Sequence, residues 1–392
     1  MRKVKVLRFG KTEFIRESED SGFPHIFLDK GKPLQGWYKN ASDKIRPRPC
    51  FTEAILTQPY GGYCPLSCAF CYVNLGIRGY RSTKCVTVCK DYPEQVQKQI
   101  SKWFIGSSFY ITPFHEPFNC LEPIYGISQK ISTLAVDLGL PIFFLSRLVY
   151  PDWAIELLRL NPYSYAQKSI ITSNATLHKK LSPKSATLEE QYHDISKLAL
   201  QGIYVSIQVN PVFLGITDEE DILKLIRNLG KAGANHIIVK FVEVPLFSWK
   251  LFLSNVEKRF GIESKKRIEN LLIENQGFQK TIPEQERRKL HNLFLNEARE
   301  HGMTYATCYE YDSSGKTSIG KEFCTADQCH GKAVPIFYRN NLNEKFKPFD
   351  VCEKTGCLYC RGKLCQHPSL IQAKAMRDKD YRIPLNSLKD CS

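Results

Sequence analysis

The sequence lacks a long apolar run, an export signal and an internal repeat. None of its 392 residues lies in a stretch approaching the roughly 18 apolar residues that a helix needs to cross a bilayer. The first residues, Met1–Val6, lack the apolar core of about 7–15 residues that marks a secretory signal. No self-similar repeat of the solenoid kind is present. We therefore expect a cytoplasmic protein with no membrane partner.

Acidic residues are few relative to basic ones. The chain has 55 Lys and Arg against 40 Asp and Glu, which gives a formal net charge of +15. A positive field of this kind attracts polyanions, and nucleic acid is the first candidate partner. The charge alone does not distinguish DNA, RNA, a nucleotide or anionic lipid from a role in solubility. The basic residues are also spread along the chain rather than gathered in one tail.

Cysteine, in contrast, is abundant, with 15 residues. Disulfides persist in oxidising compartments, so a chain without an export signal is not expected to use these cysteines as a disulfide framework. Clustered cysteines in a reducing cytosol more often bind metal or take part in redox chemistry.

Three cysteines form the most informative motif. Cys64, Cys68 and Cys71 have the spacing C-x₃-C-x₂-C, and Phe70 precedes the third. Three thiolates can bind three irons of a [4Fe–4S] cluster and leave the fourth iron without a protein ligand, whereas ferredoxin clusters use four thiolates and only transfer electrons. An open metal position can bind and activate a small molecule, as catalytic zinc sites do. The alternatives are a zinc site with a missing ligand or three unrelated cysteines.

This motif resembles the signature of the radical S-adenosylmethionine (SAM) superfamily, and other segments are similar to its spore photoproduct lyase-like branch. The similar segments span roughly residues 50–245 and are Leu56–Cys64, Thr112–Pro117, Leu145–Arg147, Ser206–Val212 and Gly215–Asp218. The resemblance implies an enzyme that cleaves SAM reductively at a [4Fe–4S] cluster. The 5′-deoxyadenosyl radical so formed abstracts hydrogen from a substrate, and the cofactor carries the difficult chemistry. An external donor of the flavodoxin or ferredoxin type is the implied electron source.

The order of expected elements predicts an α/β fold. Six strand-like runs, at 53–57, 108–112, 141–145, 168–172, 203–209 and 236–242, alternate with helical segments. Such alternation implies parallel strands, and the resemblance implies a partial (β/α)₆ TIM barrel that is open on one side. We expect a β-rich segment at 1–50, the barrel at 51–302 with a helical insertion at about 247–280, and a Cys-rich module at 303–392. The motifs follow strand ends, where barrel active sites lie.

The resemblance also implies roles for single residues. Phe70 matches an aromatic residue that touches the adenine of SAM, and Glu116 lies in a region that meets its amino group. Arg147 replaces a lysine of the branch, and Ser169 matches a position facing the carboxylate or ribose. Asn210 is a weaker candidate for SAM binding. Cys120 lies near the position of a hydrogen-donating cysteine, with a buried thiol as the alternative.

A second group of cysteines lies near the C-terminus. Four thiols fall within 14 residues, and three more precede them. The four are Cys352, Cys357, Cys360 and Cys365, and the three are Cys308, Cys324 and Cys329. Zinc ribbons favour paired C-x₂-C motifs, and only Cys357 and Cys360 have that spacing. Next to a radical SAM core, we therefore favour an auxiliary [4Fe–4S] cluster over zinc. The spore photoproduct lyase itself has no such extension.

These features lead to three functional hypotheses. The first is a radical SAM enzyme that acts on a nucleic acid or nucleotide, as a lyase, repair or modification enzyme. The second is radical SAM modification of a peptide or small metabolite with an auxiliary cluster. The third, from another class, is a non-catalytic zinc-dependent protein that binds nucleic acid. The sequence does not indicate the oligomeric state.

Overall fold

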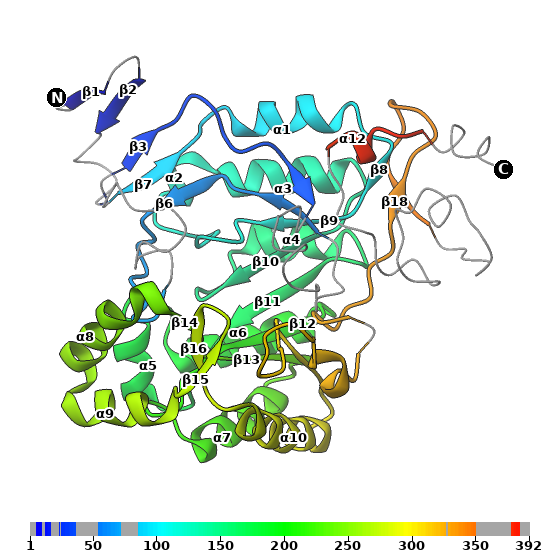
Figure 1. Cartoon of the computed structure of the whole chain (residues 1–392). Coiled ribbons are helices and arrows are strands. Elements are labelled where there is room, and N and C mark those ends of the chain that lie inside the picture. The colour runs from blue at the N-terminus through cyan, green and yellow to red at the C-terminus, as the bar shows by residue number, and fades with distance from the viewer. Residues whose placement is uncertain are drawn as a thin grey trace.

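The centre of the fold is an eight-stranded sheet with the order β17-β13-β12-β11-β10-β9-β5-β4 (Figure 1). The computed structural model describes residues 5–9, 12–16, 23, 25–36, 54–71, 85–326, 328–349 and 378–384. The strands of this sheet are β4 (Gln35–Gly36), β5 (Ala54–Thr57), β9 (Ser108–Ile111), β10 (Ile142–Ser146), β11 (Tyr165–Ser169), β12 (Val205–Val212), β13 (His236–Phe241) and β17 (Thr304–Thr307). Every neighbouring pair from β5 to β17 is parallel, and only β4 is antiparallel to its neighbour. The predicted parallel α/β sheet is therefore present.

The sheet does not close. β17 and β4 are its two edges, and no pairing joins them within the described residues. This agrees with the open barrel that the resemblance implies, but the sheet has one more parallel strand than the six predicted. The additional strand β17 pairs with β13 from His236↔Thr304 to Val239↔Thr307. Its sequence, Thr-Tyr-Ala-Thr, is short and half polar, so it lacks the apolar run that identified the other strands.

Helices cover the outer face of the sheet. They are α1 (Tyr92–Ile100), α2 (Glu122–Tyr125), α3 (Ile127–Asp137), α4 (Asp152–Arg159), α5 (Ala175–Leu181), α6 (Leu188–Leu200), α7 (Glu219–Lys231) and α10 (Glu284–Glu300). In Figure 1, α1 and α3 lie along one end of the sheet and α7 and α10 along the other. On β13, Phe241 packs against His291 of α10. Because side chains alternate along a strand, the residues between such contacts face the inner side of the sheet.

A buried ion pair joins β11 to α6. Lys168 Nζ lies 2.6 Å from Asp194 Oδ2, and both side chains are fully buried. The strand covers Tyr165–Ser169, whereas the sequence predicts 168–172. The apolar Ile170 and Ile171 suggested the later position, but they follow the strand. The strand itself carries Gln167 on its inner face and the buried lysine on its outer face, so its hydrophobicity does not reveal it.

Helix starts follow local capping. Thr187 and Glu190 form a capping box at the start of α6, which satisfies backbone donors that the helix leaves open. At α7 the cap is Asp218, whose side chain accepts a hydrogen bond from the Asp221 amide.

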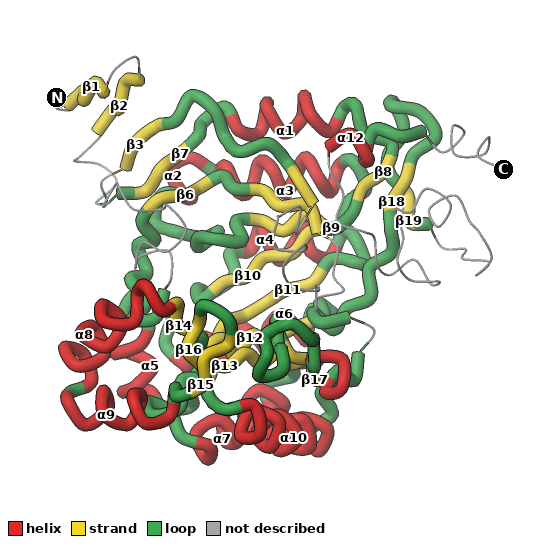
Figure 2. Tube along the Cα trace, in the orientation of Figure 1, coloured by secondary structure: helices red, strands yellow, loops and turns green. Residues whose placement is uncertain are grey.

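An insertion follows β13 at the carboxyl end of the sheet. It consists of β14 (Val244–Pro245), a 3₁₀ turn (Leu246–Ser248), α8 (Trp249–Phe260), α9 (Ile262–Leu271) and a hairpin of β15 (Glu274–Gln276) and β16 (Gln279–Thr281). Figure 2 shows the two helices beside the small sheet formed by β14, β16 and β15. The stretch predicted as helical at about 247–280 therefore also contains a hairpin.

Three smaller sheets complete the described structure. They are the pair β1 (Lys5–Phe9) and β2 (Thr12–Arg16), the sheet of β3 (His25–Phe27), β7 (Val86–Val88) and β6 (Tyr60–Gly62), and the sheet of β19 (Lys347–Pro348), β18 (Phe337–Tyr338) and β8 (Ile105–Gly106). A 3₁₀ turn at Gly320–Phe323 and helix α12 (Asp378–Tyr381) follow the main sheet. The expected division into three regions stays a prediction. Among the described helices, none is both long and apolar enough to cross a membrane.

Candidate functional site

The three-cysteine loop follows β6 and folds back on itself. The amide of Ser67 donates to the Cys64 carbonyl at 3.3 Å, and the amide of Cys71 donates to the Cys68 carbonyl at 3.2 Å. Ser67 has φ 53°, a left-handed conformation that reverses the chain between the first two cysteines. The local hydrogen bonds therefore hold the three cysteines on one short, curled loop.

The thiols of this loop influence one another. Burial raises the pKa of Cys64 well above its usual value, and the charges of Cys71 and Cys68 raise it further. Metal binding requires thiolates, and bound irons supply the positive charge that offsets both effects. In the described part of the chain, no three His, Cys, Asp or Glu side chains converge on one point as ligands of a single metal ion do. A [4Fe–4S] cluster instead places each thiolate on a separate iron, and this donor set fits it.

His115 anchors the lead-in to the loop. Its Nε2 lies 3.1 Å from the Tyr63 carbonyl and donates to it. Burial lowers the pKa of His115, so the ring is neutral; its Nδ1 faces the Glu116 carbonyl at 3.4 Å, and the shorter contact to Tyr63 favours the proton on Nε2. Nearby, the Tyr60 hydroxyl donates to Glu122 at 2.5 Å. The predicted element Thr112–Pro117 thus supports the cysteine loop through its histidine.

Glu116 joins the loop after β9 to the end of β10. Its carboxylate accepts hydrogen bonds from the Ser146 hydroxyl at 2.6 Å and from the Arg147 amide at 3.1 Å. A third bond comes from the Phe118 amide at 3.2 Å. Burial raises the pKa of Glu116, although these hydrogen bonds oppose the shift. The predicted contact of Glu116 with SAM stays a prediction.

The Arg147 side chain contacts three of the other predicted SAM-binding residues. Its Cζ lies 4.9 Å from the centre of the Phe70 ring. Its Nη1 donates to the Ser169 carbonyl at 3.3 Å, and its Nη2 donates to the Asn210 carbonyl at 3.4 Å. Ser169 is the last residue of β11, and it contacts Arg147 through its backbone carbonyl. One guanidinium group therefore connects the cysteine loop, β10, β11 and β12.

The inner face of the sheet below Arg147 is polar. Gln167 and Ser206 are partners in the β11–β12 register, and Gln208 Nε2 donates to Gln167 Oε1 at 3.4 Å. Among the described residues, Gln167 Nε2, Ser206 Oγ and Thr112 Oγ1 are buried without a hydrogen-bond partner. Buried polar atoms of this kind are usually satisfied by water or a ligand. The inner face is therefore suited to a polar ligand.

Cys120 lies at the surface. It is exposed, so the alternative of a buried thiol is wrong. It lines a pocket of about 370 Å³ together with Pro65 and Leu66 of the cysteine loop and with Lys184. Partial burial raises the pKa of its thiol, which keeps the S–H form at neutral pH.

The cysteines of the C-terminal region are described only in part. Cys308 follows β17, and its amide donates to the Val239 carbonyl at 2.9 Å. Cys324 packs against Cys329, whose carbonyl lies 3.0 Å from Nε2 of His236 on β13. The structure thus places all three beside β13 and β17. Cys352, Cys357, Cys360 and Cys365 lie outside the described residues, so the auxiliary cluster stays a prediction.

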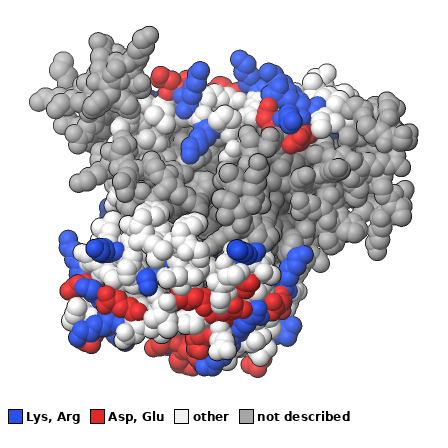
Figure 3. Space-filling model, viewed as in Figure 1, with Lys and Arg blue, Asp and Glu red and all other residues white. Residues whose placement is uncertain are grey.

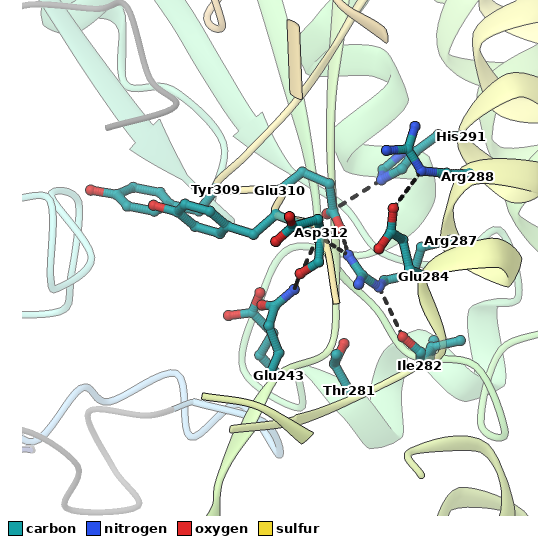
Figure 4. Close-up of polar contacts among 12 residues, drawn as sticks. Glu243, Thr281, Ile282, Glu284, Arg287, Arg288, His291, Tyr309, Glu310 and Asp312 are labelled. Carbon is teal, nitrogen blue, oxygen red and sulfur yellow. Dashed lines mark hydrogen bonds and ion pairs between the residues drawn. The ribbon is translucent and has the colours of Figure 1, made fainter. Parts of the chain in front are cut away.

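Sequence reasoning missed a charged network at the end of β17. Glu310 is buried between Arg287 and His291 of α10 (Figure 4). Lys240 of β13 binds Glu243 at 2.9 Å. No local signal marked this network, because the short strand β17 that precedes it was itself not predicted. The partners of Glu310 on α10 lie about 20 residues earlier in the chain, so sequence spacing alone could not assign them.

Comparison with known proteins identifies the family. No family model matches the chain. A curated relative described as radical SAM Nalpha-GlyT isomerase, from Pseudomonas phage M6, is 47% identical over 406 aligned residues, which cover 97% of this chain and 84% of the relative. The chain belongs to the radical SAM enzymes. The predicted family and the predicted enzyme class are therefore confirmed, and the non-catalytic zinc protein is not supported.

Solved structures agree on the fold of this radical SAM enzyme. A cysteine-to-serine mutant of spore photoproduct lyase is 15% identical, with a TM-score of 0.50 and coverage of 72% of this chain and 81% of that chain. Streptococcus suis SuiB bound to S-adenosylmethionine is 13% identical, with a TM-score of 0.43 and coverage of 71% and 58%. The family membership and the likeness to spore photoproduct lyase identify the α/β fold with a central parallel sheet as a radical SAM fold.

Proposed function

We propose that this radical SAM enzyme is an isomerase that acts on an Nα-GlyT group. The observation that carries the proposal is the 47% identity, over 97% of the chain, to a relative with that activity in its name. The arrangement around Arg147 supports it, because the cysteine loop and three neighbouring strand ends meet at one guanidinium group.

The chain offers residues for both parts of the cofactor. Cys64, Cys68 and Cys71 would bind three irons of a [4Fe–4S] cluster. Phe70 and Arg147 would hold SAM, with Glu116, Ser169 and Asn210 as the further members of the predicted set. When bound, the cluster and SAM supply a 5′-deoxyadenosyl radical that abstracts a hydrogen atom from the substrate.

Arg147 would orient the carboxylate of SAM. A guanidinium group has five donors in a planar fork that matches a carboxylate in two-point contact. The two backbone carbonyls and the Phe70 face already fix the plane of the group. The lysine of the branch would supply a point charge without this plane.

An isomerase adds and removes no atoms overall, so the abstracted hydrogen must be replaced in the product. Cys120 is the chain's candidate donor. Its raised pKa preserves the S–H bond that a donor needs. After it gives up a hydrogen atom, its sulfur would be restored by one electron from the external donor and one proton.

The name Nα-GlyT is compatible with two carriers of the group, a nucleic acid and a peptide, since T abbreviates both thymine and threonine. A nucleic acid carrier is supported by the +15 charge and by the surface of the insertion. Many large apolar side chains that are exposed in the described molecule lie there, namely Leu246, Phe247, Leu251, Ile262, Ile273 and Phe278. The backbone of Leu246 is bonded to that of Phe278 at 2.9 Å, and Lys280 lies over Trp249.

The face shown in Figure 3 has an uncharged area at the level of β14 and α8, with Lys and Arg side chains at its margin and Asp and Glu side chains along its lower border. Aromatic groups beside cations bind single-stranded nucleic acid by stacking and charge attraction. This favours thymine as the T of the substrate. A peptide carrier is the second candidate, supported by the cysteines gathered beside β13 and β17, which would hold an auxiliary cluster.

The test uses the full chain after anaerobic reconstitution. Iron analysis should give about 4 irons per chain for one cluster or about 8 for two. The protein is then incubated with SAM, dithionite and either a DNA oligonucleotide bearing Nα-GlyT or a Gly-Thr peptide. We expect 5′-deoxyadenosine and a product of unchanged mass but altered chromatographic retention from the oligonucleotide. A reaction with the peptide alone would replace the nucleic acid assignment, and no 5′-deoxyadenosine in any mixture would contradict the proposed activity.

Salt dependence gives a second measure of the carrier. Binding to the oligonucleotide should weaken steeply between 50 and 200 mM salt, by about 10³-fold or more if six phosphates are contacted, because counterions are released. Peptide binding should change far less. Location in the cytoplasm stays a prediction.

A further inference from the structure

Tyr309 has an unusual backbone conformation. The described non-glycine residues with positive φ are Ser67, Thr112 and Tyr309. Ser67 lies in the cysteine loop, and Thr112 and Tyr309 each follow a strand of the main sheet at its carboxyl end. A left-handed conformation is rare for a bulky residue and persists only where the surrounding structure fixes it. Tyr309, at φ 53°, is the bulkiest of the three.

The residue after Tyr309 is fixed from the outer side of the sheet. Glu310 is 2% exposed and forms an ion pair with Arg287 of α10. His291 Nε2 lies 3.3 Å from the same carboxylate. Arg287 also donates to the Tyr311 carbonyl at 2.8 Å. Burial favours the neutral form of Glu310, but His291 and then Arg287 outweigh it and lower the pKa, so the carboxylate stays charged.

The same segment is fixed from the inner side by Lys240. Its Nζ binds Glu243 at 2.9 Å and lies 3.4 Å from the carbonyl oxygens of both Cys308 and Tyr309. The Tyr309 ring lies 6.0 Å from this ammonium group. Contacts from β13 and from α10 thus hold the backbone on both sides of one strained residue.

This arrangement presents the Tyr309 side chain. Figure 4 shows the ring pointing away from the Glu310–Arg287 contacts, and the side chain is only partly buried. Burial raises the pKa of the phenol, so the ring carries no charge at ordinary pH. Tyr309 follows β17, the last parallel strand of the main sheet, whereas the cysteine loop comes after β6, which follows β5, the first. A ligand that spans the carboxyl end of the sheet from the cysteine loop therefore reaches toward Tyr309.

We propose that Tyr309 contacts the substrate and forms the wall of the site on the β17 side, with its ring against a planar group such as a nucleobase or an amide. Lys240, Arg287 and Glu310 are positioning residues that act through its backbone. This inference rests on the proposed radical SAM function. A structural role alone does not require a strained tyrosine, because glycine adopts positive φ without penalty.

The test compares two substitutions that both remove the ring. Tyr309→Ala keeps the strained conformation, whereas Tyr309→Gly relieves it. We expect both variants to bind a fluorescent Nα-GlyT oligonucleotide at least tenfold more weakly than wild type, while the glycine variant has the higher melting temperature of the two. If the two variants lose the same affinity although their melting temperatures differ, the loss comes from the missing ring and not from weaker folding. Tyr309→Phe keeps the ring and should stay within threefold of wild type.

The control and the activity readout separate this inference from the function on which it rests. Tyr338→Ala alters a partly exposed tyrosine on β18, which pairs with β8 ahead of β9, and should bind the oligonucleotide like wild type. Formation of 5′-deoxyadenosine without substrate should stay within twofold of wild type in every Tyr309 variant. Unchanged oligonucleotide affinity in both Tyr309→Ala and Tyr309→Gly would overturn the inference. A wild-type protein that forms no 5′-deoxyadenosine would overturn the proposed function itself.

Discussion

The guanidinium group of Arg147 lies over the ring of Phe70, with Cζ 4.9 Å from the ring centre. Phe70 precedes the last cysteine of the loop, and Arg147 follows β10. A cation over an aromatic face contributes about 0.5–2 kcal/mol. The contact therefore couples the position of the cysteine loop to the end of the sheet, and it has a measurable consequence for SAM binding.

Replacement of Arg147 should weaken SAM binding. Arg147→Lys keeps the charge but loses the planar fork, so we expect the Kd for SAM to rise about tenfold, which is about 1.4 kcal/mol. Arg147→Ala should lose more. Isothermal titration calorimetry on the reconstituted protein measures this, with Arg159→Ala, an exposed arginine at the end of α4, as the control. An unchanged Kd in Arg147→Ala would remove Arg147 from the SAM site.

Removal of the three loop cysteines should remove one cluster and all SAM cleavage. In the variant with Cys64, Cys68 and Cys71 changed to Ala, iron content should fall by about 4 per chain, and 5′-deoxyadenosine should be undetectable. Cys89→Ala, which alters a buried cysteine before α1, is the control and should keep both. Persistent SAM cleavage in the triple variant would place the catalytic cluster elsewhere.

The ion pair between Lys168 and Asp194 should be essential for stability. Both side chains are fully buried, so Asp194→Asn leaves an uncompensated charge and should lower the free energy of unfolding by about 3–5 kcal/mol. Urea unfolding followed by circular dichroism measures this. The exposed pair Lys197–Asp152 is the matched control, and Asp152→Asn should leave the urea midpoint almost unchanged, because an exposed ion pair contributes little to stability. Equal effects of the two substitutions would show that Lys168 is not charged.

Glu116 should make the fold less stable as pH rises. Because burial raises its pKa in the folded state, the folded protein binds more protons than the unfolded chain above the ordinary value of about 4.5. Stability is then lost as pH rises from that value through the raised one. Glu116→Gln removes this titration, so the melting temperature of the variant relative to wild type should increase from pH 5 to pH 8. Glu156→Gln, on the exposed side of α4, should give a curve parallel to wild type, and a parallel curve for Glu116→Gln would contradict the assignment.

The donor role of Cys120 predicts that the product incorporates hydrogen from the solvent. A thiol proton exchanges with water, so turnover in D₂O should place one deuterium in the product. Cys120→Ala should lose this label, whereas Cys89→Ala should keep it. Mass spectrometry of the product measures the label. A product that carries no solvent deuterium from wild-type protein would show that Cys120 is not the donor.

The sequence predicts the parts of the fold that rest on local pattern. The strands β9, β10 and β13 consist mostly of apolar residues because both of their faces are covered, and their positions agree with prediction within one residue at either end. The predicted range of β11 begins three residues too late, because Gln167 and Lys168 give this buried strand a polar sequence. Lys168 is accommodated through Asp194, 26 residues later, and through the Leu148 carbonyl, 20 residues earlier, and no local pattern shows these contacts.

In the candidate site, too, the local motif was predictable and the contacts between distant segments were not. The cysteine loop is contiguous in sequence, and its spacing identifies it. The meeting of Phe70, Ser169 and Asn210 at Arg147 depends on the order of strands, which the family resemblance supplied. Tyr309 was not predicted, because the residues around it come from α10 and β13, which are distant in sequence. Its unusual backbone angle is also not visible in the composition.

Lys168 has a further consequence for the site. Besides Asp194, its ammonium group binds the Leu148 carbonyl at 2.6 Å, directly after Arg147 in the chain. The Asp194 carboxylate in turn accepts from the Tyr150 amide at 3.2 Å. The segment that carries Arg147 is thus held rigidly from behind before any cofactor arrives. Little conformational entropy is left for SAM to remove at this position, and binding here is a fit to a preorganised surface rather than an ordering of a loop.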